Sequence, residues 1–130
     1  MYSAKTNGIK IDVQPVYLED ESAPDECRYF WAYSIDITNE RDDTVQLLSR
    51  HWVITDGKGM REDVHGPGVV GEQPLIEPGR NFSYTSGCPL TTPSGIMAGS
   101  YQMAASDGQL FTVNIPAFSL DLPDQKKVIN

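Results

Sequence analysis

Several residue types that carry chemistry are scarce in this sequence. Its 130 residues include two cysteines and two histidines, and no pair of them has the spacing of a zinc site. No apolar run approaches the roughly 18 residues that a membrane-spanning helix needs. The start, MYSAKTNGIKI, lacks the apolar stretch of a signal peptide. We therefore expect a cytoplasmic protein without a membrane segment, in which Cys27 and Cys88 remain reduced.

Positive charge is also scarce. Ten Lys and Arg residues stand against 18 Asp and Glu residues, which gives a net charge of −8. General binding to nucleic acid needs clustered Lys and Arg, so we expect no nucleic-acid partner. The negative charge favours solubility and basic or cationic partners, and the apolar content of 39% is ordinary for a globular protein.

Helical periodicity is absent, and an alternation of period two dominates the chain. The alternation is clearest in RYFWAYSIDITNE at 28–40, which we expect to be a central, half-buried strand. Further alternating or apolar runs that predict strands lie at 9–13, 45–54, 82–84, 101–103 and 111–115.

Turn signals separate these runs. Glu77-Pro78-Gly79-Arg80 fits a type II turn, and Ser106-Asp107-Gly108-Gln109 predicts a two-residue type I′ hairpin. Short strands without crossover helices indicate an all-β fold, an antiparallel immunoglobulin or fibronectin type III-like β-sandwich. We expect one domain over residues 1–130, with a frayed tail at about 124–130.

The segment HGPGVVGEQP at 65–74 contains G-x-G-x-x-G, the spacing that cradles pyrophosphate in dinucleotide-binding folds. Such a site needs a helix that opens at the last glycine and an acid about 20 residues further on. Pro74 and Pro78 prevent the helix, and SGCPLTTPSGI at 86–96 holds no acid.

Two local details weaken the phosphate interpretation further. Pro67 removes one amide donor, and Glu72 places a negative charge where phosphate would lie. A nest of backbone amides could still bind an anion without a helix, with Arg50, His51 or His65 nearby as the cation. We favour a structural or partner-binding loop whose glycines need positive φ or close backbone approach. Its candidate residues are Gly66, Gly68, Gly71 and Glu72.

The strand QLLSRHWVITD at 46–56 mixes Arg, His and Trp. Alternation places Arg50 with Trp52 on one side and His51 on the other. In one interpretation Trp52 packs in the core beside the stem of Arg50. In the other, Arg50, His51, Trp52 and His65 form a surface patch, since Trp and Arg are favoured interface anchors.

Catalytic and metal-binding patterns are weak. No G-x-S-x-G nucleophile elbow occurs, and we expect no catalytic residue and no cofactor. His51 and His65 stand far apart in the sequence, so we expect no metal site built on them. Weak attraction of a hard cation is one interpretation of the acidic pairs Asp42-Asp43 and Glu62-Asp63, but solvated loop charge is the better one.

Together these segments resemble the ApaG family. The resemblance rests on VQLLSRHWVITDGKG at 45–59, VHGPGVVGEQPLIEPGRNFSYTSGCPLTTPSGIMAGSYQM at 64–103 and GQLFTVNIPAFSLDLP at 108–123. It implies a fibronectin type III-like sandwich without a firmly attached enzymatic activity. It also implies a genetic link to cobalt resistance and magnesium efflux. Related domains occur in F-box proteins and in a DNA polymerase delta-interacting protein, which favours a protein-interaction module.

Three classes of function therefore stay open. We favour a non-enzymatic module that binds an unknown protein partner through the 64–78 segment. The alternatives are a nucleotide or pyrophosphate binder that uses the G-x-G-x-x-G loop, and a weak divalent-metal binder. Exposed sheet edges could also pair two chains into a homodimer.

Overall fold

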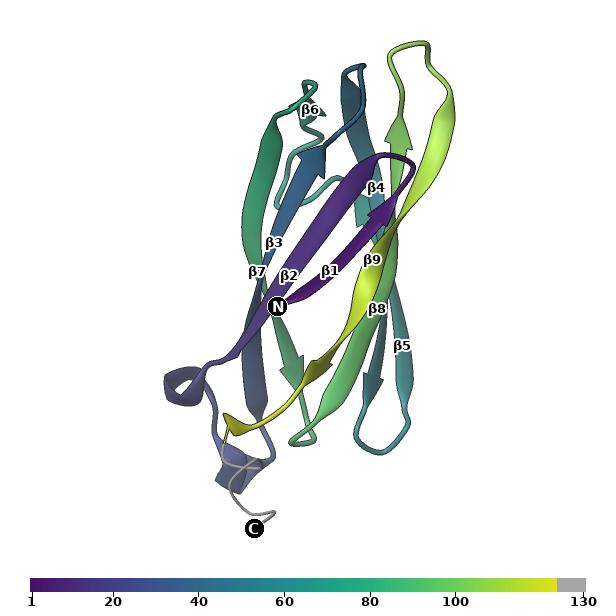
Figure 1. Ribbon diagram of the computed structural model, residues 1–130. Coiled ribbons are helices and arrows are strands. Elements are labelled where there is room, and N and C mark those ends of the chain that lie inside the picture. The colour runs from purple at the N-terminus through teal and green to yellow at the C-terminus, as the bar shows by residue number, and fades with distance from the viewer. Residues whose placement is uncertain (124–130) are drawn as a thin grey trace.

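The computed structural model describes residues 1–123, and these form two β-sheets packed face to face (Figure 1). The tail expected at 124–130 lies outside the described residues. The strands are β1 (Tyr2–Thr6), β2 (Ile9–Tyr17), β3 (Tyr29–Asn39), β4 (Val45–Asp56), β5 (Arg61–Pro67), β6 (Leu75–Ile76), β7 (Asn81–Leu90), β8 (Gly95–Ala104) and β9 (Leu110–Leu120). Two short 3-10 segments, η1 (Glu19–Glu21) and η2 (Pro24–Glu26), connect β2 to β3. Over residues 1–123, no helix has the length and apolar character to cross a membrane.

Every strand pair is antiparallel. One sheet has the order β1-β2-β3-β7, and the other has the order β5-β4-β8-β9 with β6 added to β4. Strands β1 and β2 lie against β9 of the other sheet, which closes one side of the sandwich (Figure 1). On the opposite side, β5 and β7 are the edge strands. This arrangement confirms the predicted all-β, immunoglobulin or fibronectin type III-like sandwich and the interior position of β3.

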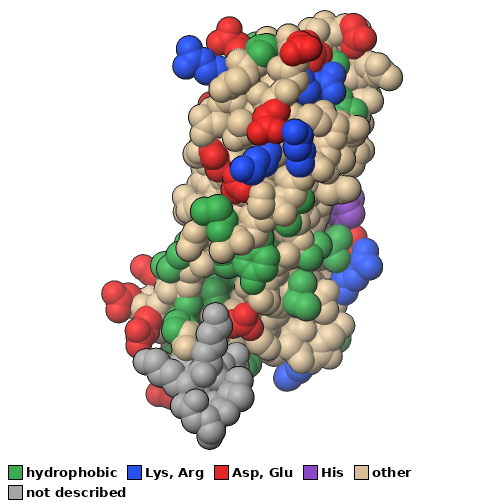
Figure 2. Space-filling model, viewed as in Figure 1, with side chains coloured by type: hydrophobic (Ala, Val, Ile, Leu, Met, Phe, Trp, Pro, Cys, Tyr) green, Lys and Arg blue, Asp and Glu red, His purple; other side chains and the backbone are tan. Residues whose placement is uncertain are grey.

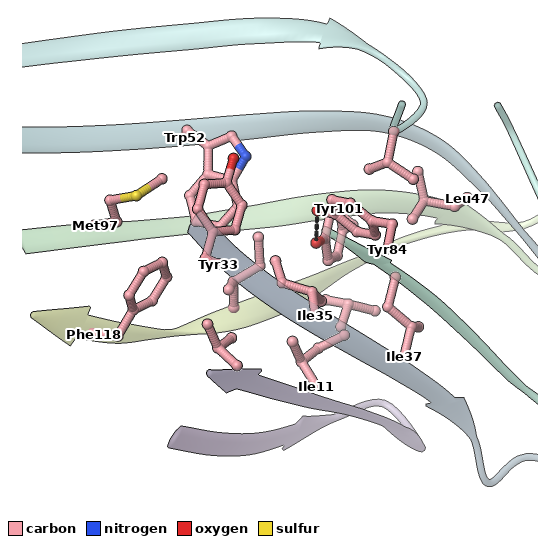
Figure 3. Packing of buried hydrophobic residues seen from close by; sticks show 14 of the residues in the cluster. Ile11, Tyr33, Ile35, Ile37, Leu47, Trp52, Tyr84, Met97, Tyr101 and Phe118 are labelled. Atoms are coloured by element: carbon pink, nitrogen blue, oxygen red, sulfur yellow. Dashed lines mark hydrogen bonds between the residues drawn. The ribbon is translucent and has the colours of Figure 1, made fainter. Parts of the chain in front are cut away.

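The core lies between the sheets because alternate side chains of each strand point inward. Figure 3 shows Tyr33, Ile35 and Ile37 of β3 facing residues of the opposite sheet. Each large apolar side chain removed from water contributes about 1.5–3 kcal/mol. Because apolar residues alternate along the 28–40 strand as predicted, its large side chains are buried between the sheets.

One of the two predicted turns is confirmed and the other is wrong in type. At 77–80, the Arg80 amide donates to the Glu77 carbonyl at 3.0 Å and Gly79 has a φ of 77°, as a type II turn requires. At 106–109 a type I′ turn would need positive φ at Asp107 and Gly108, but only Gly108 has it, at 86°. The Asp107 carboxylate accepts the Gln109 amide at 3.0 Å, which favours a type I turn followed by a glycine bulge.

Candidate functional site

The glycine loop, residues 66–73, begins in the edge strand β5 and ends in a tight turn of its own. The amides of Val69 and Glu72 each donate to the other residue's carbonyl at 2.8 Å. The two central residues both have positive φ, 43° at Val70 and 81° at Gly71. These values define a type I′ turn. A type I′ turn, which the sequence predicted at 106–109, therefore occurs at 69–72.

Gly68 fixes the loop against β4. Its φ is 59°, and a Cβ at this position would lie 2.1 Å from the carbonyl oxygen of Glu72. Its amide donates to the Leu48 carbonyl at 2.8 Å, and the Gln73 side chain donates to the same oxygen at 2.8 Å. Leu48 lies at an irregularity in the pairing of β4 with β8. The bulge turns its carbonyl toward the loop, so Gly68 serves close backbone approach, as the sequence analysis favoured.

Arg50 is the second anchor of the loop. It pairs with Gly66 across β4 and β5, and a Cβ at Gly66 would lie 2.9 Å from the guanidinium carbon. The guanidinium donates to the carbonyls of Pro67 and Gly68 at 3.1 and 2.9 Å. The Arg50 guanidinium therefore binds loop carbonyls and fixes the loop from the inner face of the sheet.

Few loop amides remain for a phosphate. Those of Gly68, Val69 and Glu72 already donate within the chain, and Pro67 has none. After Gly71 the chain runs to the short strand β6 without a helix, so no row of helical amides follows the glycines. The helix that a dinucleotide site needs after the last glycine is thus missing from the described residues, as the sequence predicted.

The loop presents one apolar side chain, Val70, to solvent at its tip, and Leu75 is exposed on the following strand β6. Val69 points inward and is only 1% exposed, whereas Val70 is 54% exposed and Leu75 is 69% exposed. Val70 was not among the candidate residues predicted from the sequence. The Val-Gly dipeptide gives no turn signal, because a β-branched residue with positive φ is a sterically unfavourable choice.

Trp52 does not belong to a surface patch. It is 3% exposed, and its ring lies 5.2 Å from that of Tyr33 and 5.9 Å from that of Phe118, centroid to centroid. Figure 3 shows it among these core side chains. Of the two interpretations of this strand, core packing is correct for Trp52, and Arg50 extends beside it.

The histidines occupy the outer face of the same sheet. His51 and His65 are direct cross-strand partners of β4 and β5, and their rings stack at 4.0 Å with an interplanar angle of 10°. Their separation in the sequence, from which we expected no metal site, does not keep the two side chains apart in the fold. The tight connection between β4 and β5 brings them face to face.

Asp63 completes this cluster. Its Oδ2 lies 3.1 Å from Nε2 of His51, and its Oδ1 accepts a hydrogen bond from Arg61 at 2.9 Å. Hydrogen bonds from Arg61 and then from His51 hold the pKa of Asp63 well below its usual range. Figure 2 shows a histidine at the edge of the molecule beside acidic and basic side chains. The signal for Asp63 was present in the sequence, because positions 63 and 65 share a face of any strand.

The sequence matches a known protein family. The family model described as the ApaG domain matches residues 19–105. The chain belongs to the ApaG family. Protein ApaG of Brucella anthropi is 59% identical over 130 residues and covers the full length of both chains. Protein ApaG of Methylobacterium sp. strain 4-46 is 56% identical, again over the full length of both.

A solved structure supports the ApaG fold. A crystal structure assigned to an ApaA protein of Bordetella pertussis superposes with a TM-score of 0.87 at 45% sequence identity. The match covers 88% of this chain and 94% of that one. The all-β sandwich described above is therefore shared with an experimentally determined relative.

Proposed function

We propose that this ApaG-family chain is a non-enzymatic protein-binding module whose contact surface is the tip of the glycine loop. The observation that carries the proposal is Val70, an exposed β-branched residue with a φ of 43°. Such a residue costs about 1–3 kcal/mol in this conformation. Asn or Gly would form the same turn without that cost.

Hydrogen bonds between Val69 and Glu72 impose this conformation, and the Val70 side chain still remains 54% exposed. Burial of its exposed part against an apolar partner surface would offset the strain. Leu75, on the following strand β6, is also exposed.

The rigidity of the loop favours the same role. Its backbone is fixed by the Arg50 and Leu48 contacts and by the mutual bonds of Val69 and Glu72. A surface that is ordered before binding avoids most of the entropy cost of ordering on association. The cobalt-resistance and magnesium-efflux role implied by the family resemblance would then act through the bound partner, in the cytoplasm.

The test compares partner capture by two matched variants. Val70→Asn removes the aliphatic group and keeps the turn, while Ile96→Thr changes an aliphatic side chain of equal 54% exposure on β8. Each purified protein is immobilised and incubated with lysate, and the retained proteins are quantified by mass spectrometry. We expect the wild type and Ile96→Thr to retain the same partner. Val70→Asn should retain about tenfold less of it, which corresponds to a loss of about 1.4 kcal/mol in binding free energy.

Equal recovery by all three proteins would contradict the proposal. Micromolar binding of pyrophosphate by the wild type in calorimetry would favour the nucleotide alternative and also count against it.

A further inference from the structure

We propose that His51, Asp63 and His65 form a binding site for an imidazole-preferring first-row transition-metal ion such as Zn²⁺. The site lies on the outer face of the β5–β4 hairpin, and each of the three residues offers one ligand atom. These atoms all lie within 4.8 Å of one another. The inference is independent of the proposed protein-binding tip and does not need it.

The backbone preorganises the three side chains. Directly opposed residues of an antiparallel pair have Cβ atoms about 4.5–5.5 Å apart, and His51 and His65 are opposed in this way. Asp63 is two residues from His65 on the same strand, so its side chain emerges on the same face. A rigid ladder therefore holds the ligands, and no loop has to fold to bring them together.

Two of the three ligand atoms already lie at a suitable distance from each other to bind one metal ion. Metal–nitrogen bonds of about 2.0–2.1 Å and tetrahedral angles place two ligand atoms about 3.3 Å apart. His51 Nε2 and Asp63 Oδ2 already lie 3.1 Å apart, where a proton now joins them. The stacked ring of His65 has to turn about its side-chain bonds to direct a nitrogen to the same point, and its exposed position leaves room for that rotation.

The donor set selects the class of metal. Two imidazoles and one carboxylate suit zinc, copper and nickel, whereas Mg²⁺ prefers an octahedral set of oxygen ligands. Three protein ligands leave the fourth tetrahedral position for water. The net charge of −8 further favours cation binding.

Arg61 is the group that opposes metal binding. Its guanidinium donates to Oδ1 of Asp63 at 2.9 Å and to Oδ2 at 3.2 Å. A metal at Oδ2 would displace the second of these bonds and leave the first, in which Arg61 orients the ligating carboxylate. Arg61 therefore has two opposed effects, because its charge repels the cation while its remaining hydrogen bond fixes the ligand.

The experiment measures Zn²⁺ affinity by competition with a chromophoric chelator on protein that carries no polyhistidine tag. The exposed thiol of Cys27 could bind zinc, so all variants are made in a Cys27→Ser background. We expect binding of one Zn²⁺ per chain and no competition by Mg²⁺. His65→Gln should weaken Zn²⁺ binding about 100-fold, and Asp63→Asn should weaken it about tenfold or more.

The matched control is Glu62→Gln, which changes a neighbouring charged residue on the opposite face of β5 and should not weaken binding. A second readout is the imidazole carbon-proton NMR spectrum, in which Zn²⁺ should shift the signals of both histidines. Equal Zn²⁺ affinity in His65→Gln, or no Zn²⁺ binding by folded protein, would overturn the proposal. Zn²⁺-dependent NMR shifts at only one of the two histidines would also overturn the proposal.

Discussion

At the scale of single residues, a hydrogen bond between two tyrosines joins the two sheets through the core. The hydroxyls of Tyr84 on β7 and Tyr101 on β8 lie 2.5 Å apart, and Figure 3 shows this bond between otherwise apolar side chains. Burial raises the pKa of both hydroxyls well above the usual range, so both remain protonated. Each hydroxyl therefore depends on the other for its hydrogen bond.

This dependence predicts a strongly non-additive pair of substitutions. Tyr101→Phe should lower the free energy of unfolding by about 1–3 kcal/mol, because it leaves the buried Tyr84 hydroxyl without a partner. Tyr84→Phe should act similarly, while the double variant should cost no more than either single one. Urea denaturation of the four proteins measures the coupling. Additive losses would show that the bond contributes little.

At the scale of elements, the glycine loop is where backbone strain and an exposed apolar group coincide. Val70→Asn places Asn-Gly at the centre of a type I′ turn, the preferred pair for that geometry. The variant should raise the free energy of unfolding by about 1 kcal/mol, since Asn tolerates positive φ.

Chemical denaturation checks this, with Ile96→Thr as the control that leaves the turn unchanged. A loss of stability in Val70→Asn would mean that the valine side chain stabilises the free protein and is not retained for a partner.

The strands were predictable from the sequence, but the turn types were only partly so. Alternation located β3 and most of the other strands because burial on one face imposes a period of two. The Pro78-Gly79 turn was predictable because its two residues set φ locally. The Asp107-Gly108 pair predicted a type I′ turn, but the hydrogen bond from the Gln109 amide to the Asp107 side chain favours a type I turn with a glycine bulge. At Val70, contacts of the flanking residues impose a conformation against local preference.

At the scale of the whole molecule, the sandwich places its two functional candidates on one hairpin. Strand β5 is an edge strand that leads into the glycine loop on one side and carries Asp63 and His65 on its outer face. The sequence could not reveal the histidine cluster directly, because the register between β4 and β5 decides which residues meet. A shift of one residue would place His65 on the other face.

A protein-contact role for the glycine loop is tested most directly by an amide NMR map of the labelled chain, recorded with and without the partner recovered by affinity capture. Perturbed amides should cluster at residues 67–75, and Val70→Asn should remove the perturbation. Perturbations confined to β1 and β2, with the loop amides unchanged, would contradict it.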